Sequence, residues 1–143
     1  MESLRISTAA EEQDVALIHR FLSEESAWAK GIPLETVRES VRNSLNFGGF
    51  IGASQVAFAR VVSDYATFAY LVDVFVLPEH RGKGYSAQLM AAVMGHPKLQ
   101  GLRRFMLATS TAHGLYTRFG FTAPVRPETL MERFVPNAYA HGL

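Results

Sequence analysis

The segment that most constrains this fold is one in which an apolar run meets a glycine-containing loop and then a helical pattern. It reads Val74-Phe75-Val76-Leu77-Pro78-Glu79-His80-Arg81-Gly82-Lys83-Gly84-Tyr85-Ser86. The apolar run predicts a buried strand. After the loop, apolar residues recur on one face of a helix, namely Leu89, Met90, Val93 and Met94. The backbone must therefore turn from a strand into a helix within this loop.

The composition of the loop indicates a binding site for a phosphate group. Glycine at positions 82 and 84 lets the backbone turn tightly and lets a bulky anion approach its amides. The start of the following helix adds unpaired N–H groups and the positive end of the helix dipole. Arg81 and Lys83 place two cations at the rim. The loop therefore predicts a pyrophosphate cradle, and the alternative is a glycine-rich turn that binds nothing.

Patterns elsewhere predict further strands and helices. Strands are expected at 4–7, 50–53, 56–62, 67–77, 105–108, 121–122 and 131–134. One helix is expected over 15–22, with Asp14 at its start, and another from Pro33 to about Gly48-Gly49. Two more are expected, from the glycine loop to Gly95 and over 112–119. This order predicts an α/β fold, with helices on both faces of a mixed sheet, as one domain over residues 1–143.

Composition narrows the class of protein. Of the 143 residues 48% are hydrophobic and none is cysteine, which excludes disulfides, thiolate metal sites and a cysteine nucleophile. The five histidines include no pair four residues apart, and we expect no metal. The net charge of +1 does not favour nucleic acid binding. No apolar run could span a bilayer and the N-terminus lacks an export pattern, so we expect a cytoplasmic protein.

A dinucleotide is one alternative ligand for the cradle. The stretch Gly82-Lys83-Gly84-Tyr85-Ser86-Ala87 fits the G-x-G-x-x-A pattern of dinucleotide-binding folds. That pattern also requires an acidic residue about 20 positions further on, where it binds the ribose. The corresponding region is Leu102-Arg103-Arg104-Phe105, which is basic. A nicotinamide-dependent enzyme is therefore disfavoured.

The same loop resembles the pyrophosphate loop of the GNAT superfamily of CoA-dependent N-acetyltransferases, whose pattern is (Gln/Arg)-x-x-Gly-x-(Gly/Ala). Here the pattern runs from Arg81 to Ser86, with serine at the last, small position. A second stretch, Leu115-Tyr116-Thr117-Arg118-Phe119-Gly120-Phe121, is similar to the L-Y-x-x-x-G-F pattern near the C-terminus of such enzymes. The two patterns follow each other in the family's order, with a predicted helix and strand between them.

The resemblance implies the GNAT fold, acetyl-CoA as cosubstrate and a set of site residues. The fold is a splayed mixed sheet flanked by helices, in which the pantetheine arm of CoA lies in the gap between two parallel strands. Backbone groups of Val74, Phe75 and Val76 would pair with that arm. The pyrophosphate would lie on Arg81, Gly82, Lys83, Gly84, Tyr85 and Ser86. Thr109 stands where the family often has an asparagine, and Tyr116 matches the tyrosine that protonates the departing CoA thiolate.

The base and the acceptor site are less clearly marked. His113 precedes Tyr116 by three residues on the predicted helix and is the first choice of base, with Asp73, Glu79 and water as alternatives. Tyr70 and Asp73 point to opposite faces of a regular strand, unless a β-bulge intervenes. Aromatic rings and carboxylates suit a cationic amine. The expected acceptor-binding residues are Trp28, Glu25, Tyr65 and Tyr70.

These features favour an N-acetyltransferase that moves an acetyl group from acetyl-CoA directly to a primary amine. The alternative is a non-catalytic acyl-CoA-binding regulatory module. The expected partners are acetyl-CoA and an amine acceptor, which is either a small molecule or a protein amine. A homodimer is left open, and no nucleic acid or membrane partner is expected.

Overall fold

A five-stranded mixed sheet forms the centre of the structure, a computed structural model that describes residues 3–140. The strands are β1 (Arg5–Ser7), β2 (Leu45–Ile51), β3 (Ser54–Ser63), β4 (Phe68–Val76) and β5 (Arg104–Leu107), and they lie side by side in that order. Pairing is antiparallel from β1 to β4 and parallel between β4 and β5. The mixed sheet expected from the sequence is confirmed.

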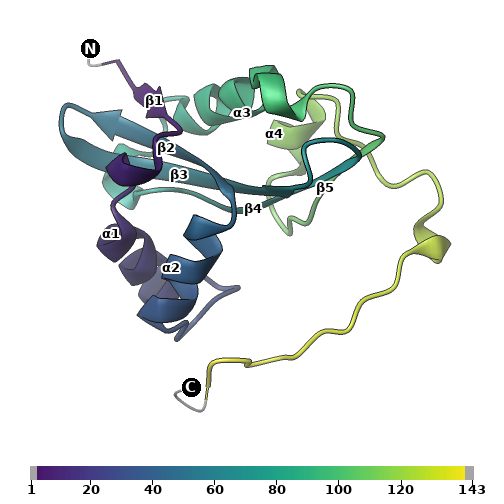
Figure 1. Cartoon of the computed structure of the whole chain (residues 1–143), viewed down its shortest axis with the longest axis horizontal. Helices are drawn as coiled ribbons and strands as arrows, with labels where there is room; N and C mark the ends of the chain where they lie inside the picture. The colour runs from purple at the N-terminus through teal and green to yellow at the C-terminus, as the bar shows by residue number, and fades with distance from the viewer. Residues whose placement is uncertain (1–2, 141–143) are drawn as a thin grey trace.

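Helices lie on both faces of this sheet (Figure 1). One face carries α1 (Val15–Arg20), extended by the π-helical turn η2 (Phe21–Glu25), and α2 (Leu34–Arg42). The other carries α3 (Tyr85–Gly95) and α4 (His113–Thr117). Within residues 3–140, no helix is long and apolar enough to cross a bilayer, and no group of three or more His, Cys, Asp or Glu side chains is placed to hold a metal ion.

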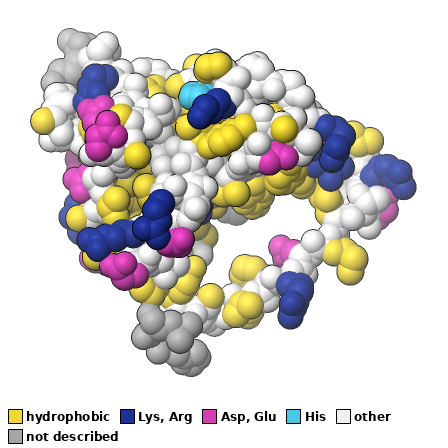
Figure 2. Space-filling model, viewed as in Figure 1, with side chains coloured by type: hydrophobic (Ala, Val, Ile, Leu, Met, Phe, Trp, Pro, Cys, Tyr) yellow, Lys and Arg dark blue, Asp and Glu magenta, His cyan; other side chains and the backbone are white. Residues whose placement is uncertain are grey.

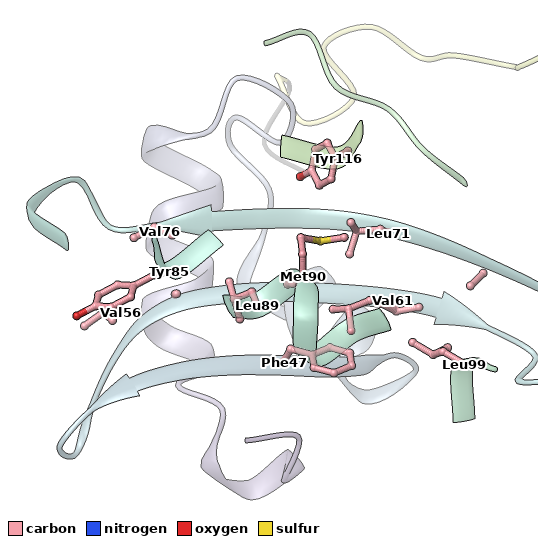
Figure 3. Packing of buried hydrophobic residues seen from close by; sticks show 14 residues of the cluster. Phe47, Val56, Val61, Leu71, Val76, Tyr85, Leu89, Met90, Leu99 and Tyr116 are labelled. Atoms are coloured by element: carbon pink, nitrogen blue, oxygen red, sulfur yellow. The ribbon is translucent and has the colours of Figure 1, made fainter. Parts of the chain in front are cut away.

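Each helical layer buries its own hydrophobic cluster against the sheet. The α3 side packs side chains that include Phe47, Val61, Leu71, Leu89 and Met90, with Tyr116 at the edge of the group (Figure 3). The α1–α2 side packs Ile18, Leu22, Val37, Phe58 and Phe75, and the Phe21 ring stacks on the Phe75 ring at 4.0 Å between centroids. Phe75 and Val76, at the end of β4, thus belong to different clusters.

The expected helix end near Gly48-Gly49 is wrong. The helix ends at Arg42, and both glycines lie inside β2. A Cβ on Gly48 would come within 2.5 Å of Gln13 Oε1, which accepts a hydrogen bond from Gln55 Nε2. Glycine is needed there because the two buried amide side chains, Gln13 and Gln55, meet over the strand. In the sequence, glycines that are required for this reason look the same as glycines that end a helix.

The two expected closing strands are absent, and α4 is shorter than the expected helix. Residues 121–122 and 131–134 belong to no strand. From Thr122 the chain forms an extended segment, residues 122–140, which we call the C-terminal arm and which contains the short 3₁₀ turn η5 (Pro127–Thr129). The arm leaves the body near α4 and β5 and ends near α1 and α2 (Figure 1).

Candidate active site

The two parallel strands of the sheet separate after four paired residues. Residues 68–71 of β4 pair with 104–107 of β5, whereas residues 72–76 of β4 have no strand on that side within the described chain. The expected splay is therefore present, and Val74, Phe75 and Val76 lie along it. Because Phe75 and Val76 bury their side chains in the two clusters, only their backbone groups are available to a ligand.

The glycine loop after β4 forms a small cavity at the start of α3. Gly82 and Gly84 have φ angles of +77° and +80°, a conformation that favours glycine. A Cβ on either residue would meet no atom within 4 Å, so both positions leave room for a ligand. Gly84 is the N-cap residue of α3 and no side chain caps the helix. The first turn, whose N–H groups have no helical acceptors, lines a cavity of about 270 Å³.

Basic side chains reach this cradle from two places in the sequence. Arg81 lines it, but its Nε donates a hydrogen bond of 2.9 Å to Val76 O, which ties the loop to the end of β4. Lys83 is exposed on the loop. Arg118, at the end of α4, also lines the cavity, and sequence reasoning missed it. It lies one helical turn after Leu115, another cradle residue, but the sequence gives no signal that α4 reaches the cradle.

His80 contributes an unpartnered polar atom to the cradle. Its ring lines the cavity, and Nδ1 is buried without a hydrogen-bond partner among residues 3–140. A buried polar atom of this kind is destabilising unless a ligand or water satisfies it. The open glycine backbone, the free N–H groups, the two arginines and this imidazole together fit an anionic ligand.

A second and larger cavity, of about 820 Å³, lies between β5 and α4. Tyr116, His113 and Thr109 all line it. Tyr116 is only 8% exposed, and burial raises the pKa of its phenol above the usual value near 10. The phenol therefore keeps its proton at neutral pH. His113 begins α4 and is exposed one turn before Tyr116.

Thr109 has a structural role at the start of α4. Its Oγ1 accepts a hydrogen bond of 3.0 Å from Ala112 N, the residue before the helix. This bond stabilises the turn that leads from β5 into α4. Thr109 thereby helps to position His113 and Tyr116, and its hydroxyl proton is still available to another acceptor.

Asp73 lies at a β-bulge on the α1–α2 side of β4. Ala59 of β3 stands opposite two residues, Asp73 and Val74, because the register shifts between the pairs Phe58–Phe75 and Arg60–Val72. Asp73 adopts a φ of +57° there. Trp28 Nε1 donates to its Oδ1 at 2.8 Å, and Arg60 Nε donates to its Oδ2 at 2.9 Å. In a regular strand Asp73 would lie on the face opposite to Tyr70. The bulge instead brings Asp73 to the same face as Tyr70.

The four expected acceptor residues are not all brought together. Trp28 and Tyr70 share the α1–α2 side of the sheet, and the Trp28 side chain is 53% exposed beside Asp73. Glu25 is exposed at the end of η2, in the same region of the chain as Trp28. Tyr65 lies elsewhere, in the β3–β4 loop, where the ammonium of Lys98 stands 5.2 Å from the centre of its ring.

Comparison with known proteins identifies the family. The sequence model of the acetyltransferase (GNAT) family matches residues 15–121. The chain belongs to the GNAT acetyltransferase family. The matched region of this GNAT acetyltransferase runs from α1 to Phe121, so it contains the cradle, the splay and Tyr116. The C-terminal arm lies beyond it.

Individual relatives agree with the assignment of this GNAT chain. A Gibberella zeae protein named as a candidate acetyltransferase is 30% identical in an alignment of 133 residues, gaps included, which covers 78% of this chain and 74% of that protein. The crystal structure of a candidate GNAT acetyltransferase from Xanthomonas campestris pv. campestris is 63% identical, with a TM-score of 0.95 over 98% of this chain and 99% of that one. A Clostridium acetobutylicum protein, described as a predicted acetyltransferase and solved with acetyl-CoA, shares the fold. It is 15% identical, with a TM-score of 0.65 over 94% of this chain and 96% of that one.

Proposed function

We propose that this chain transfers an acetyl group from acetyl-CoA directly to a primary amine. The observation that carries the proposal is that the short helix α4 serves both cavities. Arg118 lines the cradle, whereas Tyr116, two residues earlier, lines the cavity beside β5. A ligand whose phosphates occupy the cradle and whose chain follows the free edge of β4 would bring its far end toward Tyr116.

The cradle and the edge of β4 would hold different parts of the ligand. The N–H groups at the start of α3 and the cations of Arg118 and Lys83 suit a pyrophosphate. The backbone of residues 74–76 suits the amides of a pantetheine chain, as a strand edge does. Bound acetyl-CoA would supply a thioester carbonyl for the amine to attack.

Tyr116 would supply a proton to the departing sulfur. Burial holds the pKa of its phenol above the usual value, so the O–H group is present at every pH near neutrality. A positioned general acid contributes roughly 10²–10⁴-fold to a rate. The phenol also lies against the buried cluster of the α3 side, which restricts the side chain to one place.

The amine must lose a proton before or during attack, and His113 is the proposed base. It is exposed at the start of α4, one helical turn from Tyr116, and lines the same cavity. Asp73 is less suited to that task because Trp28 and Arg60 occupy its two oxygens. We therefore assign Asp73 the role of positioning Trp28, and Trp28, Tyr70 and Glu25 the acceptor side.

The experiment measures CoA binding and acetyl transfer separately. Calorimetry follows the binding of acetyl-CoA and of NADPH, and release of free thiol is followed with a panel of polyamines, amino acids, aminoglycosides and peptides with free N-termini. We expect acetyl-CoA to bind and one amine class to release thiol. Binding without transfer to any amine would favour the regulatory module. Binding of NADPH in place of acetyl-CoA would overturn the proposal.

A further inference from the structure

Hydrophobic side chains gather where the sheet borders the open space between the body and the C-terminal arm (Figure 2). In the pairing of β3 with β4, Val62 lies opposite Tyr70 and Arg60 lies opposite Val72. Opposite residues of an antiparallel pair point to the same side, and so do residues two apart along one strand. Phe68, Tyr70 and Val72 therefore share one side of the sheet with Val62. We call these four residues the acceptor face, in which Val62 is 43% exposed and Phe68 is 36% exposed.

The acceptor face begins where β4 and β5 separate. Val72 is the first residue of β4 beyond its parallel pairing with β5, which ends at residue 71. Asp73 follows at the bulge and holds the Trp28 indole by a hydrogen bond of 2.8 Å. From Val72 the face runs back along β4 to Phe68, over about 13 Å. An amine that reaches a thioester in the splay would therefore lay the rest of its body on this face.

Trp28 stands at the splay end of the acceptor face and presents its ring rather than its N–H group. The indole Nε1 donates to Asp73 Oδ1, so it is not available to a ligand. The side chain is nevertheless 53% exposed, and the hydrogen bond fixes its orientation before any ligand binds. Tyr70 supplies a second ring on the face. Because aromatic rings stack on other rings and attract ammonium groups, the two side chains suit an aromatic amine.

The carboxylates around the acceptor face match one positive charge. Asp73 is the only acidic residue in the five strands of the described chain, and both its oxygens accept hydrogen bonds from side chains of the fold. Asp64, just after β3, accepts from residues 66–68 of its own loop through both oxygens. Glu24 and Glu25 are exposed at the end of η2. An ammonium at the splay end thus has carboxylates on that side of the sheet, whereas a second ammonium farther along the sheet has none.

The cations around the acceptor face do not suit a carboxylate beside the amine. Arg60 donates from Nε to Asp73 at 2.9 Å and from Nη1 to Ser44 Oγ at 3.0 Å. Lys30 donates to a backbone oxygen of η2 at 2.7 Å. Arg104 is exposed and pairs with the first residue of β4, so it lies at the far end of the face. At that distance it cannot reach the carboxylate of an α-amino acid in the splay, and it would repel a second ammonium.

Building on the proposed acetyl transfer, we infer that the acceptor is a primary amine with one positive charge and an aromatic body, as in an arylalkylamine. The amine lies in the splay, and its ring contacts Trp28 and Tyr70. The neutral amine forms the C–N bond as the C–S bond of the thioester breaks. Its nitrogen gives one proton to His113 and Tyr116 protonates the departing sulfur, so the products are the N-acetylated amine and CoA.

Matched amines, added to the thiol-release panel, test each part of this acceptor class. Phenylethylamine is compared with ethylamine, which lacks the ring, and with L-phenylalanine, which adds a carboxylate beside the amine. Benzylamine is compared with para-xylylenediamine, which adds a second ammonium. We expect kcat/KM to be about tenfold higher, or more, for the first amine of each comparison, because the ring gains aromatic contacts and an extra charge loses water without a partner. Equal values in any comparison would contradict the class.

Fluorescence provides a measurement that needs no turnover. Trp28 is the only tryptophan in the sequence, so intrinsic emission reports on this ring. In the complex with CoA, phenylethylamine should change the emission at a concentration about tenfold lower than ethylamine does. Trp28→Gln removes the ring but keeps an N–H donor for Asp73, and it should lower kcat/KM for phenylethylamine to that for ethylamine. Phe134→Gln, which removes an exposed ring from the C-terminal arm, is the control and should keep the advantage of phenylethylamine.

The two measurements distinguish the acceptor class from acetyl transfer itself. A change in Trp28 emission without thiol release from any amine would keep the ligand class and overturn the transfer. Thiol release that is fastest with the diamine or with L-phenylalanine would keep the transfer and overturn the class. Turnover of ethylamine shows that Trp28→Gln is folded, and a persistent advantage of phenylethylamine in that folded variant would also overturn the class.

Discussion

Trp28 and Asp73 lie far apart in the sequence and are joined by a hydrogen bond of 2.8 Å from the indole Nε1 to Oδ1. The other carboxylate oxygen accepts from Arg60 Nε at 2.9 Å, and the side chains of Asp73 and Arg60 are both largely buried. This arrangement ties the loop after η2 to the bulge of β4. It therefore links the stability of the fold to the position of an exposed indole ring on the proposed acceptor side.

Replacing Asp73 with asparagine should destabilise the protein by about 3–5 kcal/mol, because Arg60 would stay buried without a countercharge. Asparagine tolerates the left-handed backbone of this position, so strain would not account for the loss. Urea unfolding provides the measurement. Adding Arg60→Met removes the unpaired charge and should recover part of the loss, whereas no recovery would contradict the explanation.

Valine at Gly84 should weaken CoA binding by about tenfold or more, since a branched side chain would occupy the space above the helix amides. Gly52, in the β2–β3 turn, is the matched control. Its φ is also positive, at +59°, and a Cβ there meets nothing within 4 Å, so Gly52→Val introduces comparable strain away from the cradle. Calorimetry should show reduced affinity for the first variant alone. If both variants fold and bind CoA with equal affinity, the loop is not part of the CoA-binding site.

Removing the phenol oxygen of Tyr116 should lower kcat and kcat/KM together by roughly 10²–10⁴-fold, with CoA affinity little changed. The interaction with the departing sulfur grows only in the transition state, which explains the equal loss in both parameters. Tyr116→Phe is compared with Tyr139→Phe, a change of the same kind at the end of the arm. Full activity of Tyr116→Phe, with chemistry as the slow step, would exclude the phenol from the mechanism.

His113→Gln should lower kcat/KM by roughly 10²–10⁴-fold, because glutamine cannot accept the amine's proton. Glutamine keeps a polar side chain at this exposed position, so the fold should be unaffected. The measurement is thiol release at neutral pH with the best acceptor from the panel. An unchanged kcat/KM in the folded variant would assign the proton to water.

Stability should fall as the pH drops below about 6.5, in part because of His96. Burial, with a smaller contribution from Lys98, lowers the pKa of His96 in the folded protein. Between the two pKa values, the unfolded chain binds a proton that the folded protein does not bind. Stability is therefore lost progressively as the pH falls from the pKa of the unfolded chain to that of the folded protein. His96→Asn keeps an acceptor for Lys98 N, to which His96 Nδ1 is bonded at 3.1 Å.

The Asn variant should therefore show a smaller fall of Tm below about pH 6.5 than the wild-type protein does. His113→Asn, at an exposed position, is the comparison. An equal acid-side fall of Tm in wild type and His96→Asn would show that other groups account for it.

Local chemistry made the cradle predictable, whereas Tyr116 was identified through the resemblance of its short pattern to the GNAT family. The turn at Gly82 and Gly84 depends on the backbone freedom of glycine, and the N–H groups that line it come from the next helical turn. Tyr116 lies in a short pattern whose spacing is set by one small helix. The first helix begins at Asp14 for an equally local reason, because its carboxylate accepts a hydrogen bond from Leu17 N at 3.1 Å.

Contacts between distant segments decided the rest. The position of Arg118 in the cradle depends on how α4 packs beside α3, and the role of Asp73 depends on a bulge whose register is set by β3. Gly48 ends no helix because Gln13 and Gln55 meet above it.

In the C-terminal arm, too, the sequence determined one property and the tertiary structure decided another. Leu130, Met131, Phe134 and Val135 have the apolar character of a strand, and that much was determined by the sequence. A strand also needs a neighbour to satisfy its backbone N–H and C=O groups. Which neighbour is available is a property of the tertiary arrangement, and here the arm passes its own β5 without pairing to it.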